Sequence, residues 1–176
     1  MTAGAKPYLD YFTLPGNGLY YNFVWGPIEF FAVDSDYHDP AGITATSRQA
    51  TWLKDALAAS TAPWKIVYFH LPPYSSGSVH GSTPELQWPF RAWGATAVLS
   101  GHEHTYERII IDGFPYFVDG LGGNGKYSFN PTPVAGSVIR YAADQGALRV
   151  TADSLSMTFE FINGQGDLID SYTIQK

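Results

Sequence analysis

The fold is decided by residues 95–108, ATAVLSGHEHTYER, in which a short apolar run leads directly into two histidines. Residues 95–99 have the length and composition of a buried β-strand, and Gly101 begins the loop that follows it. His102 and His104 therefore lie where a strand ends, the edge at which open α/β sheets bind ligands. Two imidazoles one residue apart can project toward a common point, and neutral imidazole is a preferred ligand of transition metals. The stretch predicts a metal site, although a His-x-His pair on an exposed loop can also be without function.

A second strand ends in a histidine in the same way. Residues 64–69 are apolar and lead to His70, and the two prolines that follow cannot continue a central strand because each lacks an N–H donor. Thr46 or Ser47 is expected to cap an amphipathic helix that extends through about Ala59, and this helix would make a parallel crossover from the preceding strand at 28–33. His70 is therefore expected at the same sheet edge as the His-x-His pair. The alternative for His70 is a core histidine that donates to a carbonyl.

The rest of the chain is predicted to consist mainly of strands and turns. Asp34 and Asp36 follow the strand 28–33 and are interpreted as turn formers rather than ligands. A glycine-rich run, GLGGNG at 120–125, matches the letters of a dinucleotide-binding loop, but the residues after it do not begin a helix. We expect these glycines to let a loop pass close to the predicted site. The remaining predicted elements are a strand at 19–25, a short helix at 86–93 and strands at 109–111, 115–118, 137–142, 147–152, 156–162 and 168–174.

Composition limits the classes of function. The 176 residues contain no cysteine, which excludes disulfides, iron–sulfur clusters and zinc ribbons, so any metal must be bound by nitrogen and oxygen. The formal charge of −6, with no cluster of Lys or Arg, argues against nucleic acid as a partner. No apolar run is long enough to predict a membrane span. The aromatic content leaves open a strand-rich carbohydrate-binding module in which the histidines are incidental. One domain over residues 1–176 is expected, with residues 1–11 as a loose arm.

Two sequence blocks resemble those of a known family. FHLPPY at 69–74 followed by His80, and GHEHTYER at 101–108, resemble the last two motif blocks of the calcineurin-like metallophosphoesterases, specifically the purple acid phosphatase branch. LPGN at 14–17 and a Gln-x-x-Trp-Leu helix at 49–53 follow the same order. The resemblance extends from about residue 12 to the end. Because the family's earlier Asp, Gly-Asp-x-x-Tyr and Gly-Asn-His-Glu motifs are not in this sequence, it is expected to be the C-terminal half of such an enzyme.

The resemblance implies a fold, a metal centre and residue roles. The implied fold is α/β with four layers, a β-sandwich flanked by helices, of which this chain is the second half with a strand-rich C-terminus. The implied centre is dinuclear, iron with zinc, manganese or iron, and its metal-activated hydroxide attacks phosphorus. By position, His70 and His102 resemble ligands of the second metal, His104 resembles a ligand of the first, and His80 resembles the catalytic histidine that orients the phosphate or protonates the leaving alkoxide.

The resemblance also implies partners and a location. The expected substrate is a phosphate monoester or another small phosphoester, with neither nucleic acid nor a membrane as partner, and the family suggests a secreted or periplasmic protein. Two cations repel strongly unless anionic ligands lie between them, and the bridging carboxylate belongs to a missing motif. We therefore expect this chain to be an acid phosphatase-like hydrolase by descent, and a catalytically inactive fragment is the alternative. Loss of half of the sandwich is expected to expose an apolar sheet face, which predicts self-association or pairing with the missing N-terminal half.

Overall fold

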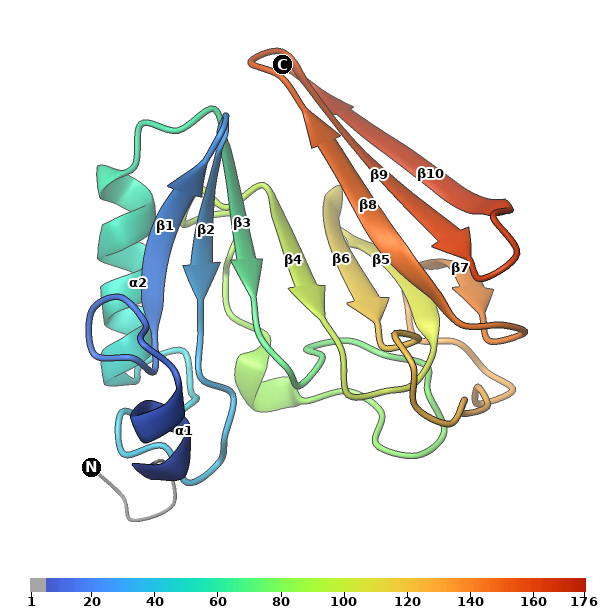
Figure 1. The fold of residues 1–176 in the computed structure, drawn as a ribbon, viewed down its shortest axis with the longest axis horizontal. Helices are drawn as coiled ribbons and strands as arrows, with labels where there is room; N and C mark the ends of the chain where they lie inside the picture. Colours follow the sequence, from blue (N-terminus) through green and yellow to red (C-terminus); the bar gives the residue numbers. More distant parts are fainter. Residues whose placement is uncertain (1–5) are drawn as a thin grey trace.

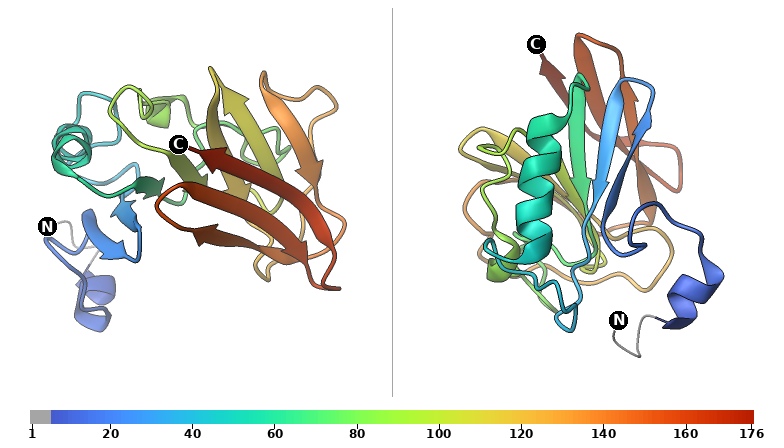
Figure 2. Two further views of the ribbon diagram at one scale, coloured as in Figure 1. Left: turned by 90° about the horizontal axis from the view of Figure 1, so that it is seen from above. Right: turned by 90° about the vertical axis from the view of Figure 1, so that its left-hand side faces the viewer.

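The computed structural model describes residues 6–176 as two β-sheets packed face to face, with one long helix against the outer face of the larger sheet (Figures 1 and 2). The larger sheet has seven strands in the order β1-β2-β3-β4-β6-β5-β7, and the smaller sheet has three in the order β10-β9-β8. The strands are Tyr21–Trp25 (β1), Ile28–Ala32 (β2), Trp64–Tyr68 (β3), Ala97–Ser100 (β4), Tyr106–Ile111 (β5), Phe114–Asp119 (β6), Ser137–Tyr141 (β7), Gly146–Ala152 (β8), Ser156–Asn163 (β9) and Leu168–Gln175 (β10).

The middle of the larger sheet is parallel. Strands β2, β3, β4 and β6 pair in the same direction, so their carboxyl ends share one edge, the lower edge in Figure 1. Strand β1 pairs antiparallel with β2 across a tight turn, and β5 pairs antiparallel with both β6 and β7. The predicted crossover from β2 through a helix to β3 is confirmed. The lower edge is therefore the place where the chain leaves each parallel strand.

Helix α2, Arg48–Ala59, covers one face of the larger sheet. Ser47 rather than Thr46 caps its amino terminus, by accepting a hydrogen bond from the backbone N–H of Ala50 at 3.2 Å. Leu53 and Leu57 are fully buried on the side of the helix that faces the sheet. This packing fixes the position of the loop that precedes α2, because the buried Gln49 side chain holds that loop through hydrogen bonds to Asp34.

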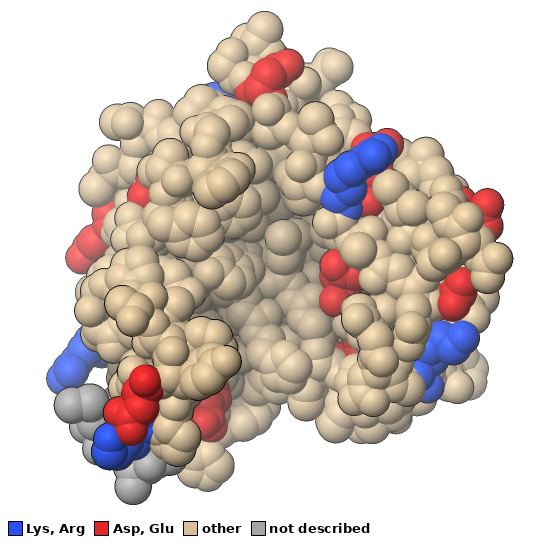
Figure 3. Space-filling view, in the orientation of Figure 1, with Lys and Arg blue, Asp and Glu red and all other residues tan. Residues whose placement is uncertain are grey.

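The opposite face of the larger sheet packs against the three-stranded sheet. Phe117 stacks on Phe159 with ring centroids 4.5 Å apart, and Tyr106 stacks on Phe161 at 4.0 Å. The mixed α/β class and the packed sheets agree with the predicted fold, and of the flanking helical layers only the one formed by α2 lies within residues 6–176. The face seen in Figure 1 is hollowed between the two sheets and carries few charged side chains (Figure 3).

A buried ion pair also joins the two sheets. Asp170 of β10 accepts hydrogen bonds from Arg108 of β5 at 2.7 and 2.9 Å and from the Tyr106 hydroxyl at 2.8 Å. Burial alone would raise the pKa of Asp170, but the hydrogen bonds from Arg108 and Tyr106 outweigh it and lower that pKa below its usual value. The carboxylate therefore stays charged inside the sandwich.

Two of the predicted elements differ from the structure. Residues 86–93 do not form a helix: a 3₁₀ turn, Pro84–Leu86, is followed by irregular chain in which Trp88 and Phe90 are both buried while Pro89 between them is exposed. Alternating burial is the pattern of an extended chain rather than of a helix. In addition, Trp88 precedes a proline, and steric clash with the proline ring disfavours helical backbone angles at such a residue. Strand β5 begins at Tyr106 rather than at 109 because the Tyr106 side chain belongs to the core between the sheets.

The predicted loose arm at residues 1–11 contains a short helix. Residues 6–11 of the predicted arm form helix α1, Lys6–Tyr11, none of whose residues is buried, and residues 1–5 lie outside the part of the chain that the structure describes. Lys6 pairs with Asp10 one turn later, which supports this short helix. Within residues 6–176, no helix is both long and apolar enough to span a membrane.

Removing the buried partner of Arg108 should destabilise the protein. In Asp170→Ala the guanidinium, 12% exposed, loses its counterion, and we expect the free energy of unfolding to fall by about 3–5 kcal/mol. Glu160→Ala is the matched control: it breaks a pair of similar length with Arg149, which is 60% exposed, and should cost less than about 1 kcal/mol. Urea unfolding measures both variants, and equal losses would contradict the role of the buried pair.

Candidate metal centre

His70 and His102 lie side by side at the carboxyl edge of the larger sheet. His70 follows β3 and His102 follows β4, and these two strands are parallel neighbours. The Nδ1 atom of His102 is 2.9 Å from the Nε2 atom of His70, and the ring centroids are 4.7 Å apart. The two strands thus bring these histidines together, as their positions in the sequence predict. Their role as metal ligands stays a prediction.

The other two histidines of the predicted site occupy different positions. The ring of His80 lies against the ring of His102, with centroids 3.8 Å apart. His104 stands apart: its ring stacks on Tyr127 at 4.0 Å, and its Nδ1 atom is 2.6 Å from the carbonyl oxygen of Gly125. In the described residues, 6–176, no three side chains of the metal-binding types surround a common point closely enough to hold an ion. The structure therefore gathers three imidazoles and leaves His104 at the rim.

The His-x-His loop alternates between surface and interior. His102 and His104 are partly exposed, whereas Glu103 and Thr105 between and after them are fully buried. His102 adopts a left-handed backbone conformation, with φ 65°, which a non-glycine residue rarely takes without support from its surroundings. The alternation turns both imidazoles outward and drives the carboxylate of Glu103 inward.

Glu103 connects this loop to the loop that carries His80. One oxygen of its carboxylate accepts hydrogen bonds from the backbone N–H groups of His80 and of Gly81, the latter at 2.6 Å. The second oxygen is buried and has no partner among the described residues. Glu103 therefore holds the backbone of the loop that carries His80.

Two glycines make room for this arrangement. A Cβ atom on Gly77 would overlap the side chain of Glu103, and a Cβ atom on Gly120 would overlap the carbonyl oxygen of Glu103. Gly120 belongs to the glycine-rich run at 120–125, so the expectation that this run lets a loop pass close to the site is confirmed. The close approach also brings Tyr127 over His104.

Burial and mutual repulsion keep the central imidazoles neutral. The pKa of His70 is lowered first by burial and then by the nearby His104 and His80, and the pKa of His102 is lowered first by burial and then by His80 and His70. Neutral imidazole is the form that binds metals. The 2.9 Å contact between the nitrogens of His70 and His102 is a hydrogen bond between the rings, and two nitrogens bound to one tetrahedral zinc ion would lie about 3.3 Å apart. The role of His70 and His102 as two ligands of one ion therefore stays a prediction.

The sequence interpretation missed three residues of this region. Glu103 and Tyr127 were treated only as neighbours of the motifs, although one positions His80 and the other stacks on His104. Glu107, also fully buried, accepts hydrogen bonds from Ser76 and from the Ser137 hydroxyl at 2.6 Å, and so attaches β5 to the loop after β3. The sequence offered only one indication for Glu103 and Glu107, their spacing of four residues on either side of the start of β5. This spacing does not tell whether a glutamate side chain is buried or exposed.

The close approach at Gly120 predicts a sharp difference between neighbouring glycines. Gly120→Ala should lower the free energy of unfolding by about 1–3 kcal/mol, since the added methyl group must displace the Glu103 backbone. Gly122→Ala is the matched control in the same run, where an added Cβ meets nothing within 4 Å. It should change stability by no more than about 0.5 kcal/mol. Thermal unfolding compares the two, and an intact Gly120→Ala protein would show that the contact is not restrictive.

Sequence comparison identifies relatives among phosphatases. The model of the calcineurin-like phosphoesterase family matches residues 3–106. Purple acid phosphatase 18 of Arabidopsis thaliana is 33% identical over 100 residues, which cover 52% of this chain and 22% of that protein. Human tartrate-resistant acid phosphatase type 5 is 30% identical over 87 residues, which cover 47% of this chain and 27% of that protein. The chain thus spans a small part of the length of the curated relatives it matches.

Structure comparison points to the same fold. The purple acid phosphatase PPD1 from yellow lupin (Lupinus luteus) seeds is similar with a TM-score of 0.83 at 22% identity, over 97% of this chain and 35% of that structure. PhoD is similar with a TM-score of 0.65 at 16% identity, over 99% of this chain and 47% of that structure. At these identities the likeness shows the fold alone. The family model, in contrast, matches more than half of the sequence, and the chain belongs to the calcineurin-like phosphoesterase family.

Proposed function

We propose that this chain contributes the histidine side of a metal-dependent phosphoester hydrolase site of the acid phosphatase kind. Membership of the phosphoesterase family supports the class of reaction. The observation that carries the proposal is the contact between His70 and His102, 2.9 Å apart at the ends of two parallel strands. In this proposal the substrate is a phosphate monoester or another small phosphoester.

His70 and His102 are assigned as ligands of one metal ion, and His104 as a ligand of a second ion in a complete site. A bound metal supplies positive charge that stabilises the phosphoryl oxygens and lowers the pKa of water toward about 7. The lowered pKa values of His70 and His102 keep their lone pairs available at neutral pH. His104 keeps one ring nitrogen occupied by the Gly125 carbonyl, which fixes the direction of the other nitrogen.

His80 is assigned as the catalytic histidine. Its ring lies against His102 and 5.8 Å from Tyr127, between centroids, while the carboxylate of Glu103 holds its backbone in place. An imidazole so placed can donate a hydrogen bond to a phosphoryl oxygen and pass a proton to the leaving alkoxide. Glu103 acts through His80 and is a positioning residue.

The local chemistry also sets the expected level of activity. The carboxylate of Glu103 within the His-x-His loop is fully buried and bound to backbone N–H groups, so we infer that it does not lie between two cations. We expect the isolated chain to bind at most one divalent ion tightly and to hydrolyse phosphate esters poorly or not at all. A catalytically inactive fragment of the family therefore remains the competing proposal.

Metal binding tests the assignment of the ligands. After removal of bound metal, titration with Zn²⁺, Mn²⁺ or Fe²⁺ should give one tight site per chain at most. Removing a residue that only hydrogen-bonds to a metal ligand typically weakens metal affinity by roughly 10–100-fold. His102→Ala removes a proposed ligand itself and should therefore weaken the affinity by more than this. His38→Ala is the control, because this histidine is 90% exposed and contacts Asp36 rather than the cluster. Unchanged affinity in His102→Ala would overturn the ligand assignment, and rapid, His102-dependent hydrolysis of p-nitrophenyl phosphate would overturn the expected low activity.

We further propose that the chain associates with a second copy of itself through β1. This strand forms one edge of the larger sheet, and it exposes Phe23, Val24 and Trp25, the last by 77%. It is the only one of the four edge strands in the described structure without an Asp, Glu, Lys or Arg, and the surface over it is largely uncharged in Figure 3. An uncharged edge strand can pair with its own copy without burying a charge.

A charge placed on this edge should prevent the association. Val24→Lys should shift the protein toward monomer in light scattering at high concentration, since pairing would bury the ammonium group. Val138→Lys is the matched control, because Val138 is exposed to a similar degree, 55% against 62%, on the edge strand β7 at the other side of the sheet. A wild-type protein that stays monomeric at high concentration would contradict the proposal, as would equal effects of the two variants.

A further inference from the structure

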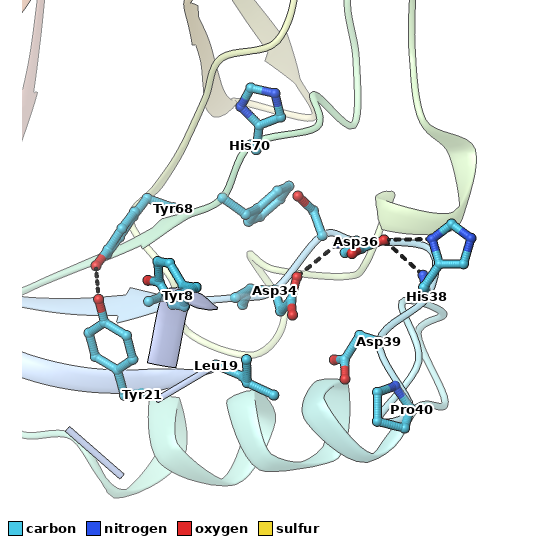
Figure 4. Close-up of a pocket in the computed structure, with 14 residues that line it drawn as sticks. Tyr8, Leu19, Tyr21, Asp34, Asp36, His38, Asp39, Pro40, Tyr68 and His70 are labelled. Atoms are coloured by element: carbon cyan, nitrogen blue, oxygen red, sulfur yellow. Dashed lines mark hydrogen bonds and ion pairs between the residues drawn. The ribbon is translucent and has the colours of Figure 1, made fainter. Parts of the chain in front are cut away.

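A large cavity adjoins the imidazole cluster and is not used by the proposed chemistry. It has a volume of about 800 Å³ and lies at the carboxyl ends of β2 and β3, and Tyr8 of helix α1 is among the residues that line it (Figure 4). His70 is the one histidine of the proposed reaction site among the described residues that line the cavity, so the two meet at this side chain. A group attached to a phosphate held at His70 could therefore extend into it.

One wall of the cavity is acidic. Asp34, Asp36 and Asp39 come from the loop between β2 and α2, and none of the described residues that line the cavity is Lys or Arg. Each carboxylate uses one oxygen to accept a backbone N–H within its own loop, at 2.9 to 3.0 Å. The buried Gln49 holds the backbone of this loop at Asp34 and at Gly42.

One of these carboxylates lacks a partner. Asp39 is 8% exposed, and its second oxygen is buried with no hydrogen-bond partner in residues 6–176. In Figure 4 this carboxylate points inward, toward Leu19 across the cavity. Burial and then the neighbouring Asp39 and Asp36 carboxylates raise the pKa of Asp34, despite a lowering hydrogen bond from the Asp36 backbone. A buried anion without a partner is unfavourable, and a cation in the cavity would relieve it.

The opposite wall is aromatic. Tyr8, Tyr21 and Tyr68 line it, and the hydroxyl of Tyr68 donates to that of Tyr21 at 3.4 Å. Aromatic faces attract cations, and cages of aromatic rings are the usual site for quaternary ammonium groups. A metal ion would not use such walls, and no three ligand side chains in the described structure are close enough to hold one.

We propose that this cavity binds a small organic cation, and that the phosphoester cleaved at His70 is the ester of a positively charged alcohol, such as choline or ethanolamine. The inference rests on the proposed hydrolase function, and it names the substrate class of that site. Hydrolysis breaks the bond between phosphorus and the alcohol oxygen and forms one between phosphorus and a water oxygen. One proton passes from the water to the leaving oxygen, so the products are inorganic phosphate and the free amino alcohol. The same carboxylates repel esters with a second anionic group.

Binding of choline chloride to the wild-type chain tests the cavity without any need for turnover. Choline should bind saturably in a calorimetric titration at pH 7. Its uncharged analogue 3,3-dimethyl-1-butanol, which has the same shape, should bind at least about tenfold more weakly. Equal binding of the two compounds, or no binding of choline, overturns the proposal. This comparison needs no variant, so it stands even if a substituted chain does not fold.

A matched pair of variants locates the bound cation. Asp39→Asn keeps the oxygen that accepts the Ala41 N–H but removes the charge, and it should weaken choline binding by about tenfold or more. Asp55→Asn makes the same charge change on the exposed surface of α2 and should leave binding unchanged. Equal choline affinity in the two variants would place the cation elsewhere and overturn the proposal.

Turnover separates this inference from the proposed function. The kcat/KM values for phosphocholine and for 3,3-dimethylbutyl phosphate are measured in the presence of added metal. A higher value for phosphocholine supports both proposals. Choline binding without hydrolysis of either ester would support the cavity and agree with the low activity expected of the isolated chain, and the metal titration of His102→Ala then tests the hydrolase assignment separately. Equal hydrolysis of both esters without choline binding would support the hydrolase and overturn the cavity. Binding to phosphatidylcholine vesicles, compared with free choline, distinguishes a lipid headgroup from a soluble ester as the source of the cation.

Discussion

The carboxylate of Glu103 lies fully buried between the loop that follows β3 and the loop that follows β4. It accepts backbone N–H groups of His80 and Gly81, so the position of each loop determines that of the other. A buried carboxylate that loses such donors is strongly unfavourable, so the two loops do not separate easily. The contact between the His80 and His102 rings follows from this one interaction. Glycines at 77 and 120 are required around it because a side chain at either position would occupy the same space.

Two different chemical environments meet at His70. On one side are neutral imidazoles, whose pKa values are lowered by burial and by each other. On the other side is a cavity with aspartates on one wall and tyrosines on the other. In our proposals both environments bind cations, a metal ion at the imidazoles and an ammonium group in the cavity. A negatively charged phosphoester can approach an acidic chain of this kind only where a local positive charge compensates for the carboxylates.

The strands and α2 could be predicted because their patterns are local. Ser47 caps α2 through an atom three residues away, and the alternation of β9 places Phe159 and Phe161 on one face whatever lies opposite. The prediction of a helix at 86–93 was wrong because Trp88 and Phe90 are both buried in the core. Their burial depends on residues far along the chain, since the Trp88 indole donates a hydrogen bond to the carbonyl of Ile43. The early start of β5 has a similar cause, since Tyr106 is held by Asp170 from the other sheet.

The sequence by itself determined that His70 and His102 meet, because both follow apolar strands joined in the parallel direction and such strands end at one edge. It also determined which motifs to compare with the phosphoesterase family. Only the tertiary structure decided that the His104 ring stacks on Tyr127 and that Glu103 holds the backbone of His80. It also decided that Asp39 lines a cavity with one carboxylate oxygen that has no hydrogen-bond partner in residues 6–176. The physical reason is that burial and hydrogen bonding depend on residues far along the chain, whereas periodicity and turn chemistry depend only on neighbours.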